Sequence, residues 1–127
     1  MPRARIDVKT LVPGVPLIGR SGRALRLRTR VHNLSTRPFP AQATHGRRLV
    51  RLGAQLGDAS GVIINRDFAR AWLPETLGPG MTLDVPIEIP GPELPGHYTL
   101  KFDLVSEGID WFEHCGSATT IKSLWVR

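Results

Sequence analysis

Three segments of the chain alternate hydrophobic and polar side chains with a period of two. In residues 25–32 every second side chain is Leu, Thr or Val, and the side chains between them are Arg or His. Residues 81–89 and 98–104 repeat the alternation. Successive side chains of a β-strand point to opposite faces of a sheet, whereas a helix would distribute these residues around its circumference. The pattern therefore predicts three strands, each with one buried face.

Shorter segments and the breaks between them extend this all-β pattern. Weaker strands are predicted over residues 5–9, 49–56, 61–65 and 120–126, with breaks rich in Gly, Pro or polar residues over residues 12–16, 35–40, 77–80 and 90–96. Residues 67–75 fit either one helical turn or an irregular strand. Seven to eight short strands separated by regular turns predict an all-β fold, an immunoglobulin-like antiparallel β-sandwich.

Two residues refine this prediction. Tyr98 follows a Pro-Gly turn at the start of a strongly alternating strand. Immunoglobulin-like sandwiches place a tyrosine corner at such a position, with the hydroxyl bonded back to nearby backbone; an ordinary core Tyr is the alternative. Pro86 has no N–H to donate to a neighbouring strand, so we expect its strand to lie at the edge of a sheet.

The chain has 127 residues, and we treat residues 1–127 as one domain: an N-terminal strand and Pro/Gly-rich lead-in over residues 1–23, then the sandwich body over residues 24–127. A chain of this length can bury a core without a disulfide or a metal ion. Its single Cys has no internal partner. No apolar run reaches the roughly 20 residues of a membrane span, and the N-terminus lacks the apolar region of a signal peptide. We therefore expect a cytoplasmic domain with no membrane span.

Charge is distributed unevenly along the chain. The net charge is +6, but residues 1–51 carry 12 basic and one acidic side chain, and residues 52–127 carry 5 basic and 10 acidic ones. A basic half is a feature of proteins that bind nucleic-acid phosphates. The Arg-rich strand, however, lacks the interleaved aromatic side chains typical of single-strand binding. Nucleic-acid binding is therefore the weaker interpretation.

Cross-strand pairing offers another explanation of the same charges. The second and fifth strands of an immunoglobulin-like sandwich are neighbours, which would bring Arg26, Arg28 and Arg30 next to Asp84 and Glu88. Opposite charges facing each other on a sheet contribute roughly 0.2–1 kcal/mol per pair. By the same argument, an ion pair between Arg51 and Asp103 is predicted on the other sheet. A mixed, solvated surface with no nucleic-acid partner is the preferred interpretation.

Sequence motifs for common chemistries are absent. There is no P-loop and no G-x-S-x-G motif. The possible metal ligands are scattered over different predicted elements, so neither a metal site nor a cofactor is expected. These residues are His32, His45, His97, His114 and Cys115. With no residue nearby to activate it, the Cys115 thiol is expected to be structural or idle.

An acidic and aromatic connection between the last two predicted strands is the most unusual part of the sequence. Its candidate ligand-binding residues are Glu107, Asp110, Trp111, Phe112, Glu113 and His114. Aromatic rings cover the apolar face of a sugar while carboxylates accept hydrogen bonds from its hydroxyls, so the segment predicts carbohydrate binding. The alternative is that an aromatic side chain folds back to seal the end of the sandwich. Asp110 and Glu113 as a catalytic carboxylate pair are a weaker possibility.

Six short motifs follow one another between residues 30 and 112. They are Arg30-Val31-His32-Asn33-Leu34-Ser35, Val50-Arg51-Leu52-Gly53, Leu77-Gly78-Pro79-Gly80, Ile87-Glu88-Ile89-Pro90, Pro95-Gly96-His97-Tyr98-Thr99-Leu100 and the run from Asp103 to Phe112. Through them, residues 24–127 resemble the immunoglobulin-like β-sandwich modules appended to bacterial glycosyltransferases, methyltransferases and other polysaccharide-related proteins. More distantly, the chain is similar to the carbohydrate-binding C-terminal domain of O-antigen ABC exporters. Phe39-Pro40 replaces the Trp-Pro usual in these modules, and residues 54–56 lack their aromatics.

The resemblance implies a non-catalytic accessory module that binds a carbohydrate or a protein partner in bacterial surface-polysaccharide metabolism. A structural or oligomerisation module, including a homodimer without a small-molecule ligand, is the alternative. A small hydrolase and a nucleic-acid-binding domain are weaker readings. Because immunoglobulin-like sandwiches serve many tasks, the motifs specify the fold better than the function.

Overall fold

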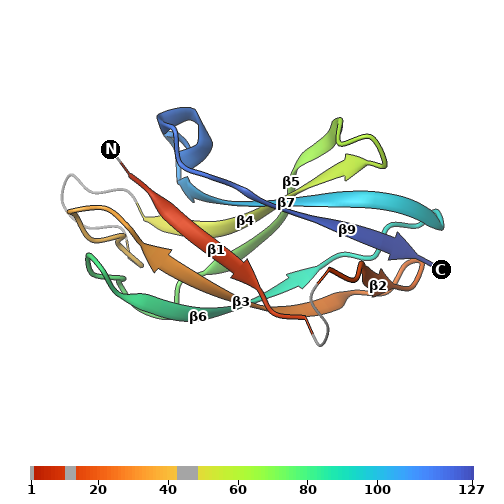
Figure 1. The fold of residues 1–127 in the computed structure, drawn as a ribbon, viewed down its shortest axis with the longest axis horizontal. Coiled ribbons are helices and arrows are strands. Elements are labelled where there is room, and N and C mark those ends of the chain that lie inside the picture. Colours follow the sequence, from red (N-terminus) through yellow and green to blue (C-terminus); the bar gives the residue numbers. More distant parts are fainter. Residues whose placement is uncertain (1, 11–13, 43–48) are drawn as a thin grey trace.

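The computed structural model describes residues 2–10, 14–42 and 49–127, and its strands form two sheets around one core (Figure 1). Sheet A has the order β1 (Ala4–Val8), β3 (Leu25–Asn33), β6 (Thr82–Ile89). Sheet B has the order β2 (Leu17–Gly19), β9 (Thr120–Val126), β7 (Gly96–Ser106), β4 (Val50–Asp58), β5 (Ile63–Trp72). Strand β8 (Asp110–Trp111) pairs with β7 and leads into the 3₁₀ helix η1 (Phe112–Cys115). No helix within these ranges is long and apolar enough to cross a membrane.

The observed strands confirm the predicted all-β sandwich and correct two details. Of the two alternatives for residues 67–75, the strand is the correct one, because β5 continues to Trp72. The short strands β2 and β8 were not predicted. Strand β2 also pairs parallel with β9, whereas the other paired strands are antiparallel. The N-terminal lead-in thus contributes β1 to sheet A and β2 to sheet B.

The alternating positions form the core. Val31 and Val85 of sheet A and Leu52 and Phe102 of sheet B are completely buried. Burial of a large aliphatic or aromatic side chain contributes about 1.5–3 kcal/mol. The polar side chain on this inner face is satisfied, since the Thr29 hydroxyl donates to the Val85 carbonyl at 2.8 Å. The residues that alternate with a period of two in the sequence therefore form the buried interface between the two sheets.

The outer face of sheet A carries the predicted ion pairs. Arg26 lies opposite Glu88 and Arg30 lies opposite Asp84 in the β3–β6 register. Their closest N···O distances are 3.6 Å and 3.1 Å. All four side chains are well exposed, so solvent screens both pairs and each contributes little to the stability of the fold.

The ion pair predicted for Arg51 is wrong in its partner. Arg51 lies opposite Val105, and its Nε is 4.0 Å from Glu107 Oε1. Asp103 instead accepts two backbone N–H groups, from Leu104 and Glu113. The error arose because strand spacing gives the face on which a side chain lies, but not the direction in which a long side chain extends.

Two other predictions about the strands are confirmed. The Tyr98 hydroxyl donates to the Leu94 carbonyl at 2.6 Å, which is the tyrosine corner. Strand β6, which contains Pro86, is the outermost strand of sheet A in the strand order. On its outer side β6 has no neighbouring strand in the described part of sheet A, so the missing N–H of Pro86 interrupts no backbone hydrogen bonds there.

Removal of the tyrosine-corner hydroxyl in Tyr98→Phe is expected to lower the free energy of unfolding by about 1 kcal/mol, because one hydrogen bond to the Leu94 carbonyl is lost. Urea unfolding measures the effect. Ser123→Ala is the control, since Ser123 is an exposed residue of β9. Equal stability of the two variants would contradict a structural role for this hydroxyl.

Candidate functional site

The acidic and aromatic connection packs back onto the outer face of sheet B. Strand β8 pairs with the end of β7, with Trp111 opposite Val105 and Asp110 opposite Ser106. The helix η1 then ends at Gly116, which has a φ of 88° and donates its N–H to the Glu113 carbonyl. Gly116 suits this left-handed conformation because it has no Cβ. The connection is therefore ordered by its own backbone hydrogen bonds.

The indole of Trp111 lies against the bare backbone of Gly53 in β4. A Cβ built on Gly53 would lie 2.6 Å from two atoms of the Trp111 ring, which is too close for any side chain. On the indole, the Arg70 guanidinium carbon is 4.5 Å from the ring centroid. Trp111 is only 9% exposed. Trp111 therefore packs between Gly53 and the Arg70 guanidinium. It folds back onto the sandwich, as the alternative to sugar binding expected, but it covers the outer face of sheet B and not the end of the sandwich.

Glu107 connects two arginines next to Trp111. Its Oε1 accepts a hydrogen bond from Arg70 Nε at 3.3 Å and forms the longer ion pair with Arg51. Asp67 pairs with the other side of Arg70 at 2.7 Å. Arg51 in turn stacks on Trp72, with its guanidinium carbon 3.6 Å from the ring centroid. Two stacked cation–indole pairs thus flank one carboxylate.

The remaining candidate residues are also engaged with neighbours. Lys101 donates to Glu113 Oε1 at 2.5 Å, and His114 Nδ1 is 2.5 Å from Asp110 Oδ1. The hydrogen bond from His114, with a second from the Trp111 N–H, lowers the pKa of Asp110 below its usual value. A carboxyl with a lowered pKa stays ionised and is a poor general acid at neutral pH. The geometry thus gives no support to Asp110 as a catalytic acid.

Asp103 is the buried acid beneath this segment. It is 1% exposed and accepts the Leu104 N–H at 2.9 Å and the Glu113 N–H at 2.8 Å. Burial raises the pKa of Asp103 to about 6, and the negative charge of Glu113 acts in the same direction. Through the Glu113 N–H, Asp103 links η1 to strand β7.

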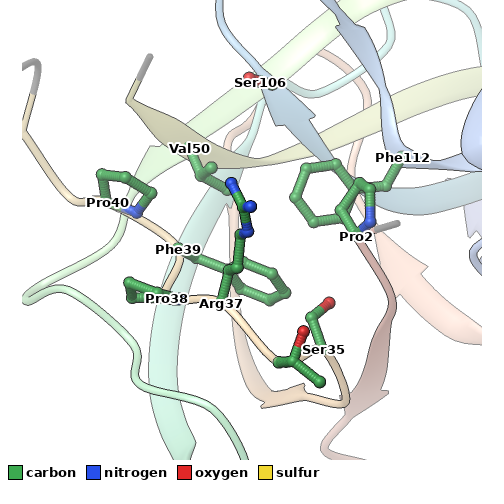
Figure 2. Close-up of a pocket in the computed structure, with 10 residues that line it drawn as sticks. Pro2, Ser35, Arg37, Pro38, Phe39, Pro40, Val50, Ser106 and Phe112 are labelled. Atoms are coloured by element: carbon green, nitrogen blue, oxygen red, sulfur yellow. The ribbon is translucent and has the colours of Figure 1, made fainter. Parts of the chain in front are cut away.

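Phe112 points to the other side of the connection, into the end of the sandwich. Its ring packs edge-on against Phe39, with centroids 5.1 Å apart and planes at 73°. Next to this pair lies a pocket of about 580 Å³ (Figure 2). The pocket is lined by Pro2, Ser35, Thr36, Arg37, Pro38, Phe39, Pro40, Val50, Ser106 and Phe112. In Figure 2 the Arg37 side chain points from its loop toward Val50.

Asn33 shapes the loop that forms most of this pocket. Its buried amide donates to the Arg37 and Leu77 carbonyls at 2.9 Å and 3.0 Å and accepts the Ser35 N–H at 2.8 Å. Phe39 and Leu77 also form an isolated bridge between the two connections. The polypeptide from 33 to 40 is therefore held by an internal network.

Of the six candidate residues, Phe112 alone lines the end pocket. Glu107, Asp110, Trp111, Glu113 and His114 are not among its lining residues. Sequence reasoning missed residues 35–40 because their Pro content suggested only a break between strands. The one available signal was Asn33, a polar residue in the inward-facing phase at the end of the strand, whose side chain can hold a turn.

Metal-ligating groups do not gather in the described parts of the chain. No cluster of three His, Cys, Asp or Glu side chains there is suited to a metal ion. Cys115 is a free thiol. His45, one of the scattered histidines considered in the sequence, lies outside the described residues.

Comparisons with known proteins bear on the fold. No protein-family model matches the chain. No curated protein matches it either. Among solved structures, the chain is similar to the CARDB domain of the PF1109 protein from Pyrococcus furiosus, crystallised in complex with di-metal ions: 13% identity, 99% of this chain and 89% of that chain covered, TM-score 0.57. It is also similar to a β-glucosidase from Listeria innocua, with 14% identity, 98% of this chain and 16% of that chain covered, and a TM-score of 0.56.

These likenesses define the class of the protein. The chain is an immunoglobulin-like β-sandwich module, as the strand pattern predicted. In the β-glucosidase the similar region is a small part of a larger chain, since only 16% of that chain is covered. At these identities the likeness concerns the fold, and fold alone does not determine function.

The contact between Trp111 and Gly53 predicts the effect of one added methyl group. Gly53→Ala is expected to displace the indole and destabilise the fold by about 1–3 kcal/mol, because a Cβ would lie 2.6 Å from the ring. Gly19→Ala is the matched control, since its Cβ would make an ordinary 3.6 Å contact with Leu124. Urea unfolding and tryptophan emission report both effects. An unchanged emission spectrum in Gly53→Ala would contradict the packing of Trp111 on this glycine.

The buried carboxyl of Asp103 predicts a pH dependence of stability. Its folded pKa of about 6 exceeds the unfolded value near 3.8, so the folded state binds more protons between these values. The contribution of Asp103 is therefore greatest below pH 4 and is lost as the pH rises to 6. Asp103→Asn should remove this decline. Parallel stability profiles for both proteins between pH 4 and pH 6, measured by urea unfolding, would contradict the assignment.

Proposed function

We propose that this chain is a non-catalytic immunoglobulin-like accessory module that binds a carbohydrate at the end pocket. The proposed setting is bacterial surface-polysaccharide metabolism, which the sequence resemblance implies. The observation that carries the proposal is the pocket of about 580 Å³ beside Phe39 and Phe112. Pockets for small ligands measure about 300–1,000 Å³. The volume therefore suits one or a few sugar units.

The lining of the pocket combines the contacts that sugars need. Phe39, Phe112 and the proline rings offer apolar surface for the C–H face of a sugar. Ser106 adds a hydroxyl, and Arg37 adds a guanidinium that donates several hydrogen bonds. Arg37 is exposed, and none of the described carboxylates lies within 4 Å of its nitrogens. Its guanidinium is thus available to a ligand.

The same lining supports a non-catalytic role. None of the ten described lining residues is Asp, Glu, His or Cys. General acid–base catalysis of glycoside hydrolysis uses a pair of carboxyl groups beside the scissile bond. The carboxylates of the neighbouring connection instead bind Arg70, Lys101 and His114. The pocket is therefore equipped for binding rather than hydrolysis.

Position in the fold also supports ligand binding. The pocket lies where the β3–β4 loop meets the end of β7 and the start of η1. Loops at the ends of a rigid sandwich commonly carry binding, because the sheets hold them in fixed positions. Asn33 fixes the start of the β3–β4 loop through its hydrogen bonds with Ser35, Arg37 and Leu77. A preformed segment loses less conformational entropy on binding.

Isothermal titration with defined neutral and uronate-containing oligosaccharides of two to four units tests the proposal. Arg37→Ala should weaken binding roughly tenfold, because charge-assisted hydrogen bonds to the ligand are lost. Arg66→Ala is the control, since Arg66 is an exposed arginine of β5 outside the pocket. No binding of any oligosaccharide, or equal weakening by both variants, would contradict carbohydrate binding at this site.

A further inference from the structure

A second, smaller pocket lies at the opposite end of the sandwich. Its volume is about 280 Å³, and its lining is Ile18, Gly19, Arg20, Arg23, Ala24, Leu25 and Arg127. The lining residues come from β2, from the turn between β2 and β3, from the start of β3 and from the residue after β9. In Figure 1 this region, with β2 and the C-terminal end, lies far from the N-terminal end. The pocket is thus separate from the proposed carbohydrate site.

Backbone hydrogen bonds hold the three arginines of this pocket together. The Arg127 N–H donates to the Gly19 carbonyl at 3.0 Å, and the Arg127 carbonyl accepts the Ser21 N–H at 2.8 Å. The Arg23 N–H donates to the Arg20 carbonyl at 3.0 Å, which closes the turn. Arg20 and Arg23 of one turn and Arg127, which is distant in sequence, therefore emerge from one hydrogen-bonded scaffold.

The neighbouring β6–β7 turn fixes this scaffold from the side. A Cβ built on Gly91 would lie 2.2 Å from the Arg23 carbonyl oxygen, so only glycine permits this approach. The Gly22 N–H donates to the Pro92 carbonyl at 3.0 Å, and the Ser21 hydroxyl donates to the Glu93 carbonyl. The backbone beneath the arginines is therefore clamped before any ligand arrives.

The charges of these arginines are not neutralised by ion pairs. Within the described chain, no carboxylate lies within 4 Å of the guanidinium nitrogens of Arg20, Arg23 or Arg127. Arg26 and Arg30, which follow directly in β3, each have an acidic partner. The cross-strand pairing that balances sheet A thus stops at this end of the sandwich.

The carboxylate of Glu93 lies near the scaffold. Glu93 Oε2 would lie 3.3 Å from a Cβ on Gly22, on the turn that carries Arg20 and Arg23. Its charge opposes anion binding without forming an ion pair with a described cation. Glu93 therefore offers a direct test of the electrostatic sign of the site.

We propose that this pocket is a binding site for a phosphoryl group of a phosphorylated ligand. Guanidinium groups present planar forks of N–H donors that match phosphate oxygens. A phosphate monoester carries a charge between about −1.5 and −2 at neutral pH, so several guanidiniums are needed to balance it. Ile18, Ala24 and Leu25 add apolar side chains to the lining beside the arginines. The site is independent of the carbohydrate pocket.

Titration of the ¹⁵N-labelled chain with inorganic phosphate and pyrophosphate, followed through the arginine Nε–H signals, tests this site. We expect saturable shifts at Arg20, Arg23 and Arg127, and a loss of affinity of roughly tenfold in the double variant Arg20→Gln/Arg23→Gln. Arg28→Gln is the matched control. Arg28 is an exposed arginine of β3 opposite Pro86, outside the pocket, and screening should limit its effect to about twofold.

Glu93→Gln should change phosphate affinity in the direction opposite to the arginine variants. Loss of this negative charge should increase phosphate affinity, whereas a loss of affinity would overturn the proposal. Arg28→Gln and the double variant Arg20→Gln/Arg23→Gln are compared by the loss of phosphate affinity for each charge removed. An equal loss would also overturn the proposal, because binding would then follow net charge alone. So would the absence of saturable shifts in the folded wild-type chain.

Phosphatidylcholine vesicles with and without phosphatidic acid distinguish two sources of the phosphoryl group. Binding to the phosphatidic acid vesicles that is lost in Arg20→Gln/Arg23→Gln would assign the site to a lipid headgroup. Saturable phosphate binding without vesicle binding would assign it to a soluble phosphorylated ligand. Vesicle binding that survives in the double variant, with no phosphate shifts, would place membrane contact elsewhere and overturn the proposal.

Discussion

The contact between the Trp111 indole and the backbone of Gly53 determines how the end of the sandwich around Phe39 and Phe112 is built. Because Gly53 has no side chain, the indole lies directly on sheet B. The backbone of Asp110 and Trp111 pairs with the end of β7. The next residue, Phe112, then points away from that face and reaches Phe39. One aromatic residue thus anchors the connection while its neighbour forms a wall of the end pocket.

Most of the sandwich could be predicted because its two inner faces follow a simple period of two. The same period placed Arg26 and Arg30 opposite Glu88 and Asp84, since strand register and side-chain direction are linked. Strand β2 escaped prediction because a three-residue strand is too short to show alternation. Residues 67–75 left a choice between a helical turn and an irregular strand, because β5 alternates between buried and exposed positions only near its end.

The candidate site was less predictable, since composition shows which residues are close in sequence but not which partners they meet in space. Arg70 approaches Glu107 from a strand 37 residues away. Lys101 reaches Glu113 from the neighbouring strand β7. These cations turned a segment that resembled an open sugar-binding surface into a packed cover of sheet B. The end pocket depends instead on the Asn33 amide, whose three contacts no periodic pattern encodes.

The two ends of the sandwich differ in chemistry, with aromatic and proline rings around one pocket and three arginines around the other. We propose that the aromatic end carries the carbohydrate-binding surface. Backbone amide shift mapping with a bound oligosaccharide tests this proposal most directly. We expect shifts concentrated at Ser35, Phe39 and Phe112. Shifts concentrated instead around Trp72 and Trp111 on the outer face of sheet B would contradict it.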